Sequence, residues 1–470
     1  MKQIKSVTLF LAIYGYHFLV FRVLPVRGWY SVDWLFLSAK ASLIPTVEGP
    51  QILQLNGGRP PIPLLLEFLT PSFMETPLLI YSGIVFYLLS RLSRSRISVP
   101  LKWLYALTLV FSLPSIAVWF QTYWLLAFLF VLPAISLLIR YLNKFEVHDL
   151  FLFSILYGLS ILTDYCTIVL LPSFLVLLPF MLREKEKNYI IAVIGIVILP
   201  ALMALASWMY LNWLLLGNSL SFLKYVRDRM TELAFAKISG SGSILQWDYI
   251  LPFVLLHLGI LLNTRFRDIH GKYIFTSLSI ISVIPYYMLY LLDYFDYQSI
   301  SIYALTSSIW FIGLLLPYVK LTKFNQTVAG MLLFALLIWS WSYLYRHPRE
   351  ELAEQIVFPK AESYYELAVE LDRLPKGSLL MDDKSMYPVL SFRHKKDSDI
   401  LPYDDEYNLA LNRPFLYADY IALLKNPERD QLAFTYWSDI ESNRLQDYKL
   451  LWSKDNLLLF KRTVSNEADN

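Results

Sequence analysis

The chain has 470 residues, of which 56% are apolar and 17% charged, and its mean hydropathy is +0.47. Soluble globular proteins carry about 25% charged residues, so this composition indicates a protein of the lipid bilayer. The net charge of +3, with no basic patch interleaved with aromatic residues, excludes nucleic acid as a partner. The single cysteine, Cys166, excludes an intramolecular disulfide and a thiolate metal cluster.

Apolar runs dominate the first three quarters of the chain. A helix that crosses a bilayer needs about 20 mostly apolar residues. Runs of about this kind lie at 6–24, 74–90, 101–118, 122–139, 149–163, 166–182, 190–215, 249–262, 274–292, 302–318 and 327–345. No small-residue cleavage site follows the first run, which indicates a retained signal-anchor. The runs 149–163 and 166–182 are separated only by Asp164 and Tyr165 and form either two spans or one broken hairpin.

Positive charge gathers in every second connection between these runs. The basic connections are 91–96, 140–144, 183–187, 265–267 and 320–323. Cytoplasmic loops of membrane proteins are enriched in Lys and Arg, so the pattern predicts a multi-pass protein of a cytoplasmic (inner) membrane with its N-terminus inside. The loop 25–71, the segments 216–248 and 293–301 and the C-terminal tail then face outward.

The loop between the first two runs, 25–71, is far longer than most other connections. Its segment 31–41 predicts an amphipathic helix on the outer membrane surface, with Trp34, Leu35 and Ala41 in the interface. Charged side chains at a membrane surface are costly to place there without a function. This loop is therefore where we expect chemistry.

Three charged residues of the loop are candidates for that chemistry. Asp33 and Lys40 fall at i and i+7 on one helix face. An outward-facing carboxylate can act as a general base toward a hydroxyl, and Lys40 and Arg59 can neutralise a phosphate. The alternatives are that Asp33 caps or solvates the helix and that Lys40 snorkels. The run 57–61 around Arg59 lacks the ending of a phosphate-binding P-loop, so its tight turn is either functional or purely structural.

Two further outward-facing features are polar. Asp164 is a functional candidate because charge is rare between apolar runs; the alternative is a polar turn in a hairpin. The stretch 293–297 is acidic and aromatic, and we interpret it as part of an interfacial aromatic belt. No two histidines have metal-ligand spacing, which argues against a zinc site. No cofactor is expected, and the sequence gives no support for a divalent metal.

The composition becomes polar from about residue 346. A helix is expected at 361–374, a strand at 378–382, and further elements at 417–424 and 449–460. These elements predict a small α/β domain, 346–470, outside the membrane. The predicted fold class is therefore mainly α: a polytopic helical membrane domain, 1–345, of about eleven spans, followed by a small extracytoplasmic α/β domain.

The combination of features resembles the GT-C class of membrane glycosyltransferases, and within it bacterial protein-mannosyltransferase-like and aminoarabinose-transferase-like proteins. The first loop carries Asp33, and an Arg-Pro-Pro sequence at 59–61 leads into the next segment. The stretch 210–223 is similar to the class signature NW-L-FG-P--FL. The stretch 162–172 is similar to Leu-Thr-Arg-Tyr followed by Leu-Leu-Pro, and 457–462 resembles the final strand.

The resemblance implies a polyprenyl-phosphate sugar donor and transfer on the outer face of the membrane, with a glycan, lipid or protein as acceptor. Asp33 matches the first-loop acidic residue that acts as catalytic base, and Lys40 and Arg59 are local candidates to neutralise the leaving phosphate. Asp164 stands where many members have an arginine. Tyr303 stands in a late loop that often carries an Arg-Tyr pair, here without the arginine.

Two other functions stay open at this point. A catalytically degenerate GT-C-like protein can scaffold a cell-envelope glycan complex, and a related fold can transport a lipid-linked glycan. Ion-coupled transport uses carboxylates within the spans, and such mid-span charges are nearly absent here. The sequence therefore favours the glycosyltransferase over the transporter.

Overall fold

The computed structural model describes residues 2–26, 32–46, 59–69, 75–95, 97–111, 122–222, 309–310, 313–314, 323–346, 361–394 and 398–463. The chain forms two compact units. The helical unit comprises Met1–Phe21, Gly57–Pro63 and Met74–Ile356. The α/β unit comprises Arg22–Asn56, Leu64–Phe73 and Val357–Asn470. Much of the long first loop thus belongs to the same unit as the C-terminal segment, whereas the predicted division at 345/346 grouped it with the helices.

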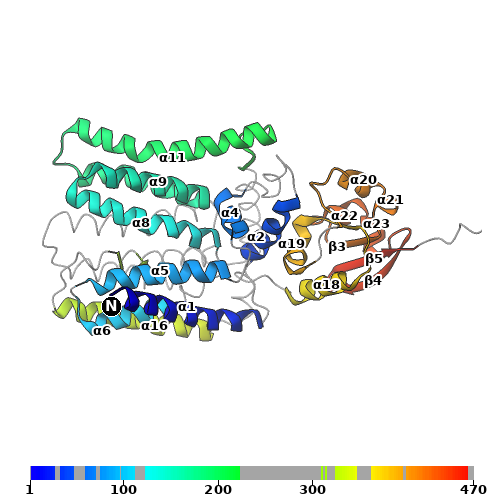
Figure 1. Ribbon diagram of the computed structural model, residues 1–470, viewed down its shortest axis with the longest axis horizontal. Coiled ribbons are helices and arrows are strands. Elements are labelled where there is room, and N and C mark those ends of the chain that lie inside the picture. Colours follow the sequence, from blue (N-terminus) through cyan, green and yellow to red (C-terminus); the bar gives the residue numbers. More distant parts are fainter. Residues whose placement is uncertain are drawn as a thin grey trace, which may run out of the picture. The chain divides into compact units, whose positions relative to one another are not determined.

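Apolar helices make up the described part of the helical unit (Figure 1). They are α1 (Lys2–Val26), α5 (Glu75–Ser93), α6 (Val99–Phe111), α8 (Thr122–Lys144), α9 (Val147–Thr163), η3 (Tyr165–Val169), α10 (Leu170–Met181), α11 (Lys187–Leu216) and α16 (Lys323–Arg346). Each of the seven predicted runs from 6–24 to 190–215, together with 327–345, overlaps a helix within the described residues. The predicted runs 249–262, 274–292 and 302–318 lie entirely or almost entirely outside the described residues.

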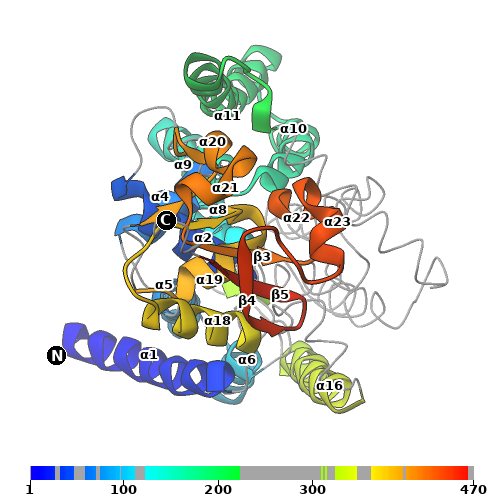
Figure 2. The ribbon, with the colours of Figure 1, turned by 90° about the vertical axis from the view of Figure 1, so that its right-hand side faces the viewer.

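The helices α8, α9 and α11 run side by side, while α1 crosses obliquely (Figures 1 and 2). Polar bonds between helices tie α8 to its neighbours. The hydroxyls of Tyr87 on α5 and Ser136 on α8 lie 2.7 Å apart, and those of Tyr141 on α8 and Tyr189 on α11 also lie 2.7 Å apart. Arg140 on α8 forms an ion pair with the fully buried Asp149 on α9.

A glycine sets the close approach of α9 and α11. A Cβ built at Gly158 would lie 3.1 Å from the carbonyl oxygen of Pro200 on α11 and 3.5 Å from the side chain of Ala204. Small residues allow two helix backbones to come together in this way. The contact between α9 and α11 therefore depends on the missing side chain at Gly158.

Two helices are long and apolar enough to cross a membrane, α8 over Leu126–Lys144 and α11 over Lys187–Leu214. The apolar stretches of the other helices in the described part are shorter, such as Val7–Leu19 in α1 and Gln326–Ile338 in α16. The apolar stretch of α8 is 61% buried inside the protein, whereas the apolar stretch of α11 is only 17% buried. Large side chains of α11 such as Leu199, Met203 and Trp213 are more than half exposed. An apolar surface of this kind indicates membrane association; the multi-pass arrangement stays a prediction.

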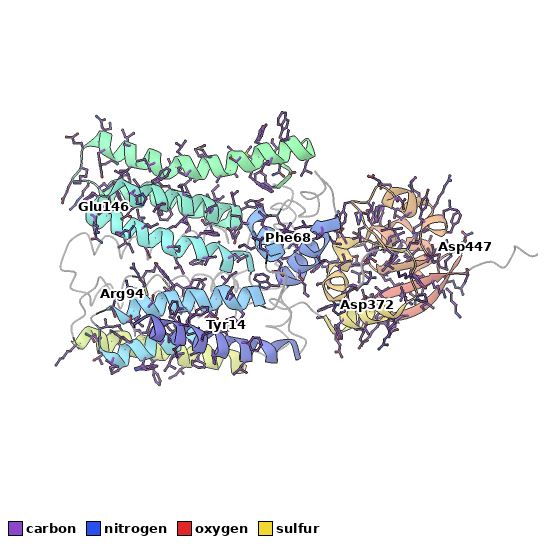
Figure 3. The ribbon with its side chains drawn as sticks, viewed as in Figure 1. Tyr14, Phe68, Arg94, Glu146, Asp372 and Asp447 are labelled. Atoms are coloured by element: carbon purple, nitrogen blue, oxygen red, sulfur yellow. The ribbon has the colours of Figure 1, made fainter. Side chains whose placement is uncertain are left out.

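Basic turns lie together at one end of the helical unit. Figure 3 places Arg94, which follows α5, and Glu146, which follows α8, at the same end. The N-terminus of the chain lies at that end in Figure 1 as well. The turns 91–96 and 140–144 carry the positive charge that the sequence assigned to the cytoplasmic side. The turn at Asp164 follows the C-terminal end of α9, one helix length away from Glu146.

The α/β unit contains a five-stranded sheet of order β2-β1-β3-β5-β4. Its strands are β1 (Leu379–Met381), β2 (Asp399–Ile400), β3 (Tyr420–Leu424), β4 (Tyr448–Lys454) and β5 (Leu457–Arg462). Its C-terminal helices are α18 (Ala361–Arg373), α19 (Asp383–Phe392), α20 (Tyr407–Asn412), α21 (Pro414–Tyr417), α22 (Gln431–Thr435) and α23 (Trp437–Glu441). Strand β1 is parallel to β2 and β3, whereas β5 is antiparallel to β3 and β4. The predicted mixture of helices and strands near the C-terminus is confirmed.

The hairpin between β4 and β5 follows from its turn residues. Asp455 and Asn456 have φ angles of 48° and 68°. Two-residue hairpin turns of this hand require positive φ at both central positions, which Asp and Asn tolerate best among residues with a side chain. The turn signal at 454–456 therefore marks the reversal of the chain.

Helices cover the sheet on both faces. One apolar cluster joins α18 and α19 to the sheet through residues such as Leu367, Val389 and Leu459. The other joins α20, α22 and α23 to the opposite face through residues such as Ala410 and Leu432. Such a three-layer arrangement buries the apolar side chains of the strands on both faces of the sheet.

The first-loop helix α2 (Val32–Leu43) is a further part of this core. Ala39 and Leu43 are at most 2% exposed and belong to the same apolar cluster as α18 and α19. After α2 come η1 (Ile44–Thr46) and, further along the loop, α4 (Pro61–Leu69). The α/β unit is therefore assembled from parts of the first loop and from the C-terminal segment, which lie far apart in the sequence.

Candidate functional site

The helix α2 carries Asp33 as its second residue. The predicted helix at 31–41 is thus confirmed, and it ends shortly before Pro45, which cannot continue the backbone hydrogen bonds of a helix. The backbone of Asp33 is placed by α2, while its side chain lies outside the described residues. Its role as a catalytic base stays a prediction.

The surroundings of α2 differ from those predicted. Trp34, Leu35 and Ala41 are at most 4% exposed, so protein covers them. The expectation that these three side chains sit in a lipid interface is therefore wrong. The periodicity of apolar residues shows which helix face avoids water, but it does not distinguish lipid from protein as the partner of that face.

Lys40 lies in the last turn of α2 and forms an ion pair with Asp383, the first residue of α19. Lys40 is 2% exposed and Asp383 is 5% exposed. The ammonium also lies 5.3 Å from the ring centre of Phe36 and 5.7 Å from that of Tyr403. Aromatic faces favour a cation at such distances. Lys40 is thus enclosed by a carboxylate and two aromatic rings. It neither extends to a membrane interface nor lies at the protein surface.

Apolar contacts continue along the same side of α2. The rings of Phe36 on α2 and Tyr387 on α19 pack edge to face with their centres 5.6 Å apart. One and two turns away, Ala39 and Leu43 enter the core described above. Charge, ring and aliphatic contacts therefore all join α2 to the α19 side of the sheet.

Two buried aspartates fix the end of α19 against the sheet. Asp382 directly follows β1 and accepts hydrogen bonds from the backbone amides of Lys384 and Gln431, at 3.0 and 2.8 Å. It therefore caps α19, as Asp prefers at this position, and also links it to α22. Because β1 and β3 are parallel, their carboxyl ends meet at this edge.

Asp430 is the second of these aspartates and is 1% exposed. It accepts hydrogen bonds from the Ser385 hydroxyl and from the amides of Leu424 and Ala433, each amide at 3.0 Å. Burial raises the pKa of Asp430 to about 6, against these hydrogen bonds, which favour the ionised form. Ligands often bind at the carboxyl ends of parallel strands, where the strand order switches direction. In this sheet the buried hydrogen bonds of Asp382 and Asp430 occupy that position.

Arg59 belongs to the helical unit, just before α4, and Asp33 belongs to the α/β unit. The side chain of Arg59 is half-buried. Pro60 and Pro61 follow it, and Pro61 is the first residue of α4, a position that suits proline because no helical N–H is lost there. The predicted meeting of Asp33 and Arg59 at one cavity stays a prediction.

Asp164 ends α9 in the helical unit and is 7% exposed. Its carbonyl oxygen accepts hydrogen bonds from the amide and the hydroxyl of Thr167, at 3.0 and 2.9 Å. The tight turn η3 then leads into α10. The two predicted apolar runs are therefore two separate helices, and Asp164 forms the corner between them.

Next to this corner, two stretches singled out in the sequence meet. The indole nitrogen of Trp208 donates a hydrogen bond to the Tyr165 hydroxyl at 2.7 Å, and the ring of Tyr165 lies 5.3 Å from that of Phe222. The Ser221 hydroxyl donates to the Asn212 side chain at 2.5 Å. The stretches 162–172 and 210–223 thus form one polar and aromatic corner. Tyr303, and the stretch 293–297, lie outside the described residues.

The sequence analysis missed Asp382, Asp383 and Asp430. A signal for two of them was present, because each of Asp382 and Asp430 stands directly before a short helix. No comparable signal links Asp383 to Lys40, since their contact is non-local. In the described part of the chain, no group of three or more His, Cys, Asp or Glu residues is placed to hold a metal ion.

No protein-family model matches the chain, and no curated protein does. The function therefore has to be argued from the residues and their geometry.

Proposed function

We propose that this protein is a polytopic, GT-C-like glycosyltransferase of a prokaryotic cytoplasmic membrane. It moves a sugar from a polyprenyl-phosphate donor to a glycan, lipid or protein acceptor on the outer face. The observation that carries the proposal is that α2, the first-loop helix with Asp33, is built into the core of the α/β unit. A loop helix held in this way suits a catalytic carboxylate, which needs a fixed position.

The charge of the helix ends supports the proposed orientation. Basic turns cluster at the end of the helical unit that holds Arg94 and Glu146 (Figure 3). By the positive-inside rule this end is cytoplasmic. The first loop, the corner at Asp164 and the α/β unit are then extracytoplasmic, and the chain crosses the membrane about eleven times.

The proposed reaction uses Asp33 as general base. Its carboxylate takes the proton of the acceptor hydroxyl while the oxygen attacks the anomeric carbon of the donor sugar. The bond between that carbon and the phosphate oxygen breaks, and polyprenyl phosphate leaves with the bonding electrons. Arg59 neutralises this phosphate by a bidentate contact. Asp164 and Tyr303 complete the proposed substrate contacts, and bilayer lipids surround the donor chain.

A second candidate function is a catalytically degenerate GT-C-like scaffold for cell-envelope glycan assembly. The burial of Lys40 favours it, because one of the two cations predicted to meet the donor phosphate is already paired with Asp383. For Lys40 to bind a phosphate directly, that phosphate would have to displace Asp383. Arg59 alone then carries the proposed phosphate contact.

A transfer assay separates the two functions. The full chain in proteoliposomes is supplied with undecaprenyl-phosphate mannose, glucose or aminoarabinose carrying a labelled sugar, and both transfer and hydrolysis are followed. We expect Asp33→Asn to lose activity by about 100-fold or more, and the matched control Asp405→Asn, at an exposed position of the α/β unit, to keep it. Full activity of Asp33→Asn would exclude Asp33 as the base. No transfer, hydrolysis or donor binding by the wild type would favour the scaffold.

A further inference from the structure

The ion pair between Lys40 and Asp383 joins two helix ends of opposite polarity. Lys40 lies in the last turn of α2, where the helix dipole favours a cation. Asp383 lies in the first turn of α19, where the dipole favours an anion. Both side chains are at least nine-tenths buried. A buried charge without its partner is strongly destabilising, so each residue fixes the place of the other.

Buried hydrogen bonds hold the α19 end of this ion pair in place. Asp382 bonds both the amide of Lys384 within α19 and that of Gln431 at the start of α22. Asp430 in turn accepts a hydrogen bond from Ser385 on α19 and from the amide of Leu424 at the end of β3. The first turn of α19 is therefore tied to two neighbouring parallel strands. The ion pair with Asp383 therefore fixes the position of α2 relative to the sheet.

The α2 end of the pair lies on the same helix as the proposed base. Asp33 precedes Lys40 by two helical turns, about 10 Å along the helix axis. Phe36 packs on Tyr387 in the turn between them, and Leu43 enters the core in the turn after Lys40. A shift of α2 along or around its axis would break these contacts and would move the backbone of Asp33 with them.

We infer that Lys40 and Asp383 are positioning residues, through which the C-terminal α/β domain sets the place of the catalytic helix α2. The inference rests on the proposed function, because it gives the position of α2 a role in sugar transfer. It assigns Lys40 to the anchoring of α2 in place of a contact with the donor phosphate. It also gives the C-terminal domain a part in the reaction without contact to substrate.

The first arm of the test measures the anchoring without any substrate. Hydrogen–deuterium exchange is followed in the full detergent-solubilised chain, on peptides that cover α2. We expect Asp383→Asn to speed the exchange of α2 by about tenfold or more, because the Lys40 charge loses its partner. The control Glu366→Gln breaks a half-exposed ion pair with Lys454 in the same domain and leaves α2 protected. Unchanged exchange of α2 in Asp383→Asn would overturn the anchoring.

The second arm separates anchoring from a phosphate contact. Lys40→Met is expected to lower kcat by about tenfold or more while the donor KM stays within about twofold, since misplaced groups slow chemistry more than binding. The double variant Lys40→Met/Asp383→Leu removes both charges and fills their place with apolar volume, which often keeps a fold intact. We expect it to recover both α2 protection and kcat.

The outcomes of the two arms are distinct. Recovered protection of α2 in the double variant with kcat as low as in Lys40→Met would mean that substrate uses the Lys40 charge, and would overturn the inference. A wild-type kcat in Lys40→Met with fast-exchanging α2 would overturn it as well. Absence of any sugar transfer by the wild type counts against the proposed function, whereas the exchange data still decide whether Asp383 anchors α2.

Discussion

The two units of this protein differ in the surface that they expose more than in the side chains that they bury. In the helical unit, apolar side chains such as Phe128 fill the interior, but large apolar side chains also lie on the surface, and Trp103 on α6 is 68% exposed. Its buried Asp149 is paired with Arg140. In the α/β unit, aliphatic residues fill both faces of a sheet, and its buried aspartates Asp382 and Asp430 cap short helices. The exposed apolar surface of helices such as α11 therefore distinguishes the helical unit from the sheet domain and indicates membrane association.

The helix α2 is the instructive case between the two. It follows α1 in the sequence, yet Ala39 and Leu43 pack as core residues of the α/β unit. Its charged residue Lys40 is buried in an ion pair with Asp383, as buried charges in water-soluble domains usually are. The helix α2 of the first loop is therefore a structural part of the C-terminal domain, and this membership can be tested by mutation.

The largest expected effect comes from truncating the core contact of α2. Leu43→Ala should lower the opening free energy of the α/β unit by about 2–5 kcal/mol, as much as Leu390→Ala within α19, because both side chains are at most 2% exposed in one cluster. Hydrogen exchange of β1 and β3 in the full chain measures this energy. Leu19→Ala, at a position of α1 that is 68% exposed, is the control. An effect of Leu43→Ala as small as that of Leu19→Ala would show that α2 is not part of the core of this domain.

A second, pH-dependent effect is expected from Asp430. Its folded-state pKa, about 6, lies above its ordinary value of 3.8, so the folded domain binds the proton more tightly than the unfolded chain does. Its contribution to stability is then greatest below pH 4 and declines as the pH rises to 6, by up to about 3 kcal/mol. The difference in opening free energy between wild type and Asp430→Asn isolates this group from other carboxylates. A difference that grows from pH 4 to 6.5 would show that its three hydrogen bonds outweigh burial.

The smallest of these effects concerns packing in the helical unit. Gly158→Val places a branched side chain 3.1 Å from the Pro200 carbonyl and should destabilise the contact between α9 and α11 by about 1–3 kcal/mol. Gly195→Val on α11 is the matched control, because nothing lies within 4 Å of a Cβ built there. Thermal melting in detergent compares the two variants. Equal melting temperatures would contradict the close approach at Gly158.

The sequence predicted the helices well because their signal is local. Each apolar run needs only its own residues to form a helix in lipid, and the corner at Asp164 was visible as two polar residues between runs. The turn at Asp455 and Asn456 was likewise marked by residues that tolerate positive φ. Local chemistry therefore gave most of the elements.

The partners of those elements were harder to predict, because they come from distant parts of the chain. Trp34 and Leu35 were expected to face lipid, but protein covers them. Lys40 was expected at a surface, and its partner Asp383 belongs to a segment more than half the chain away. The candidate site was therefore predicted less fully than the fold. The structure describes the backbone of α2, and the roles of Asp33, Arg59 and Tyr303 stay predictions.

The most direct measurement of the central claim is the transfer rate of Asp33→Ala, with and without added formate. If Asp33 is the general base on α2, the variant should lose about 100-fold or more of the wild-type rate, and formate should restore about tenfold by accepting the proton in place of the carboxylate. The anchoring of α2, followed by hydrogen exchange, should stay as in the wild type. A variant that transfers sugar at the wild-type rate without formate would contradict the account.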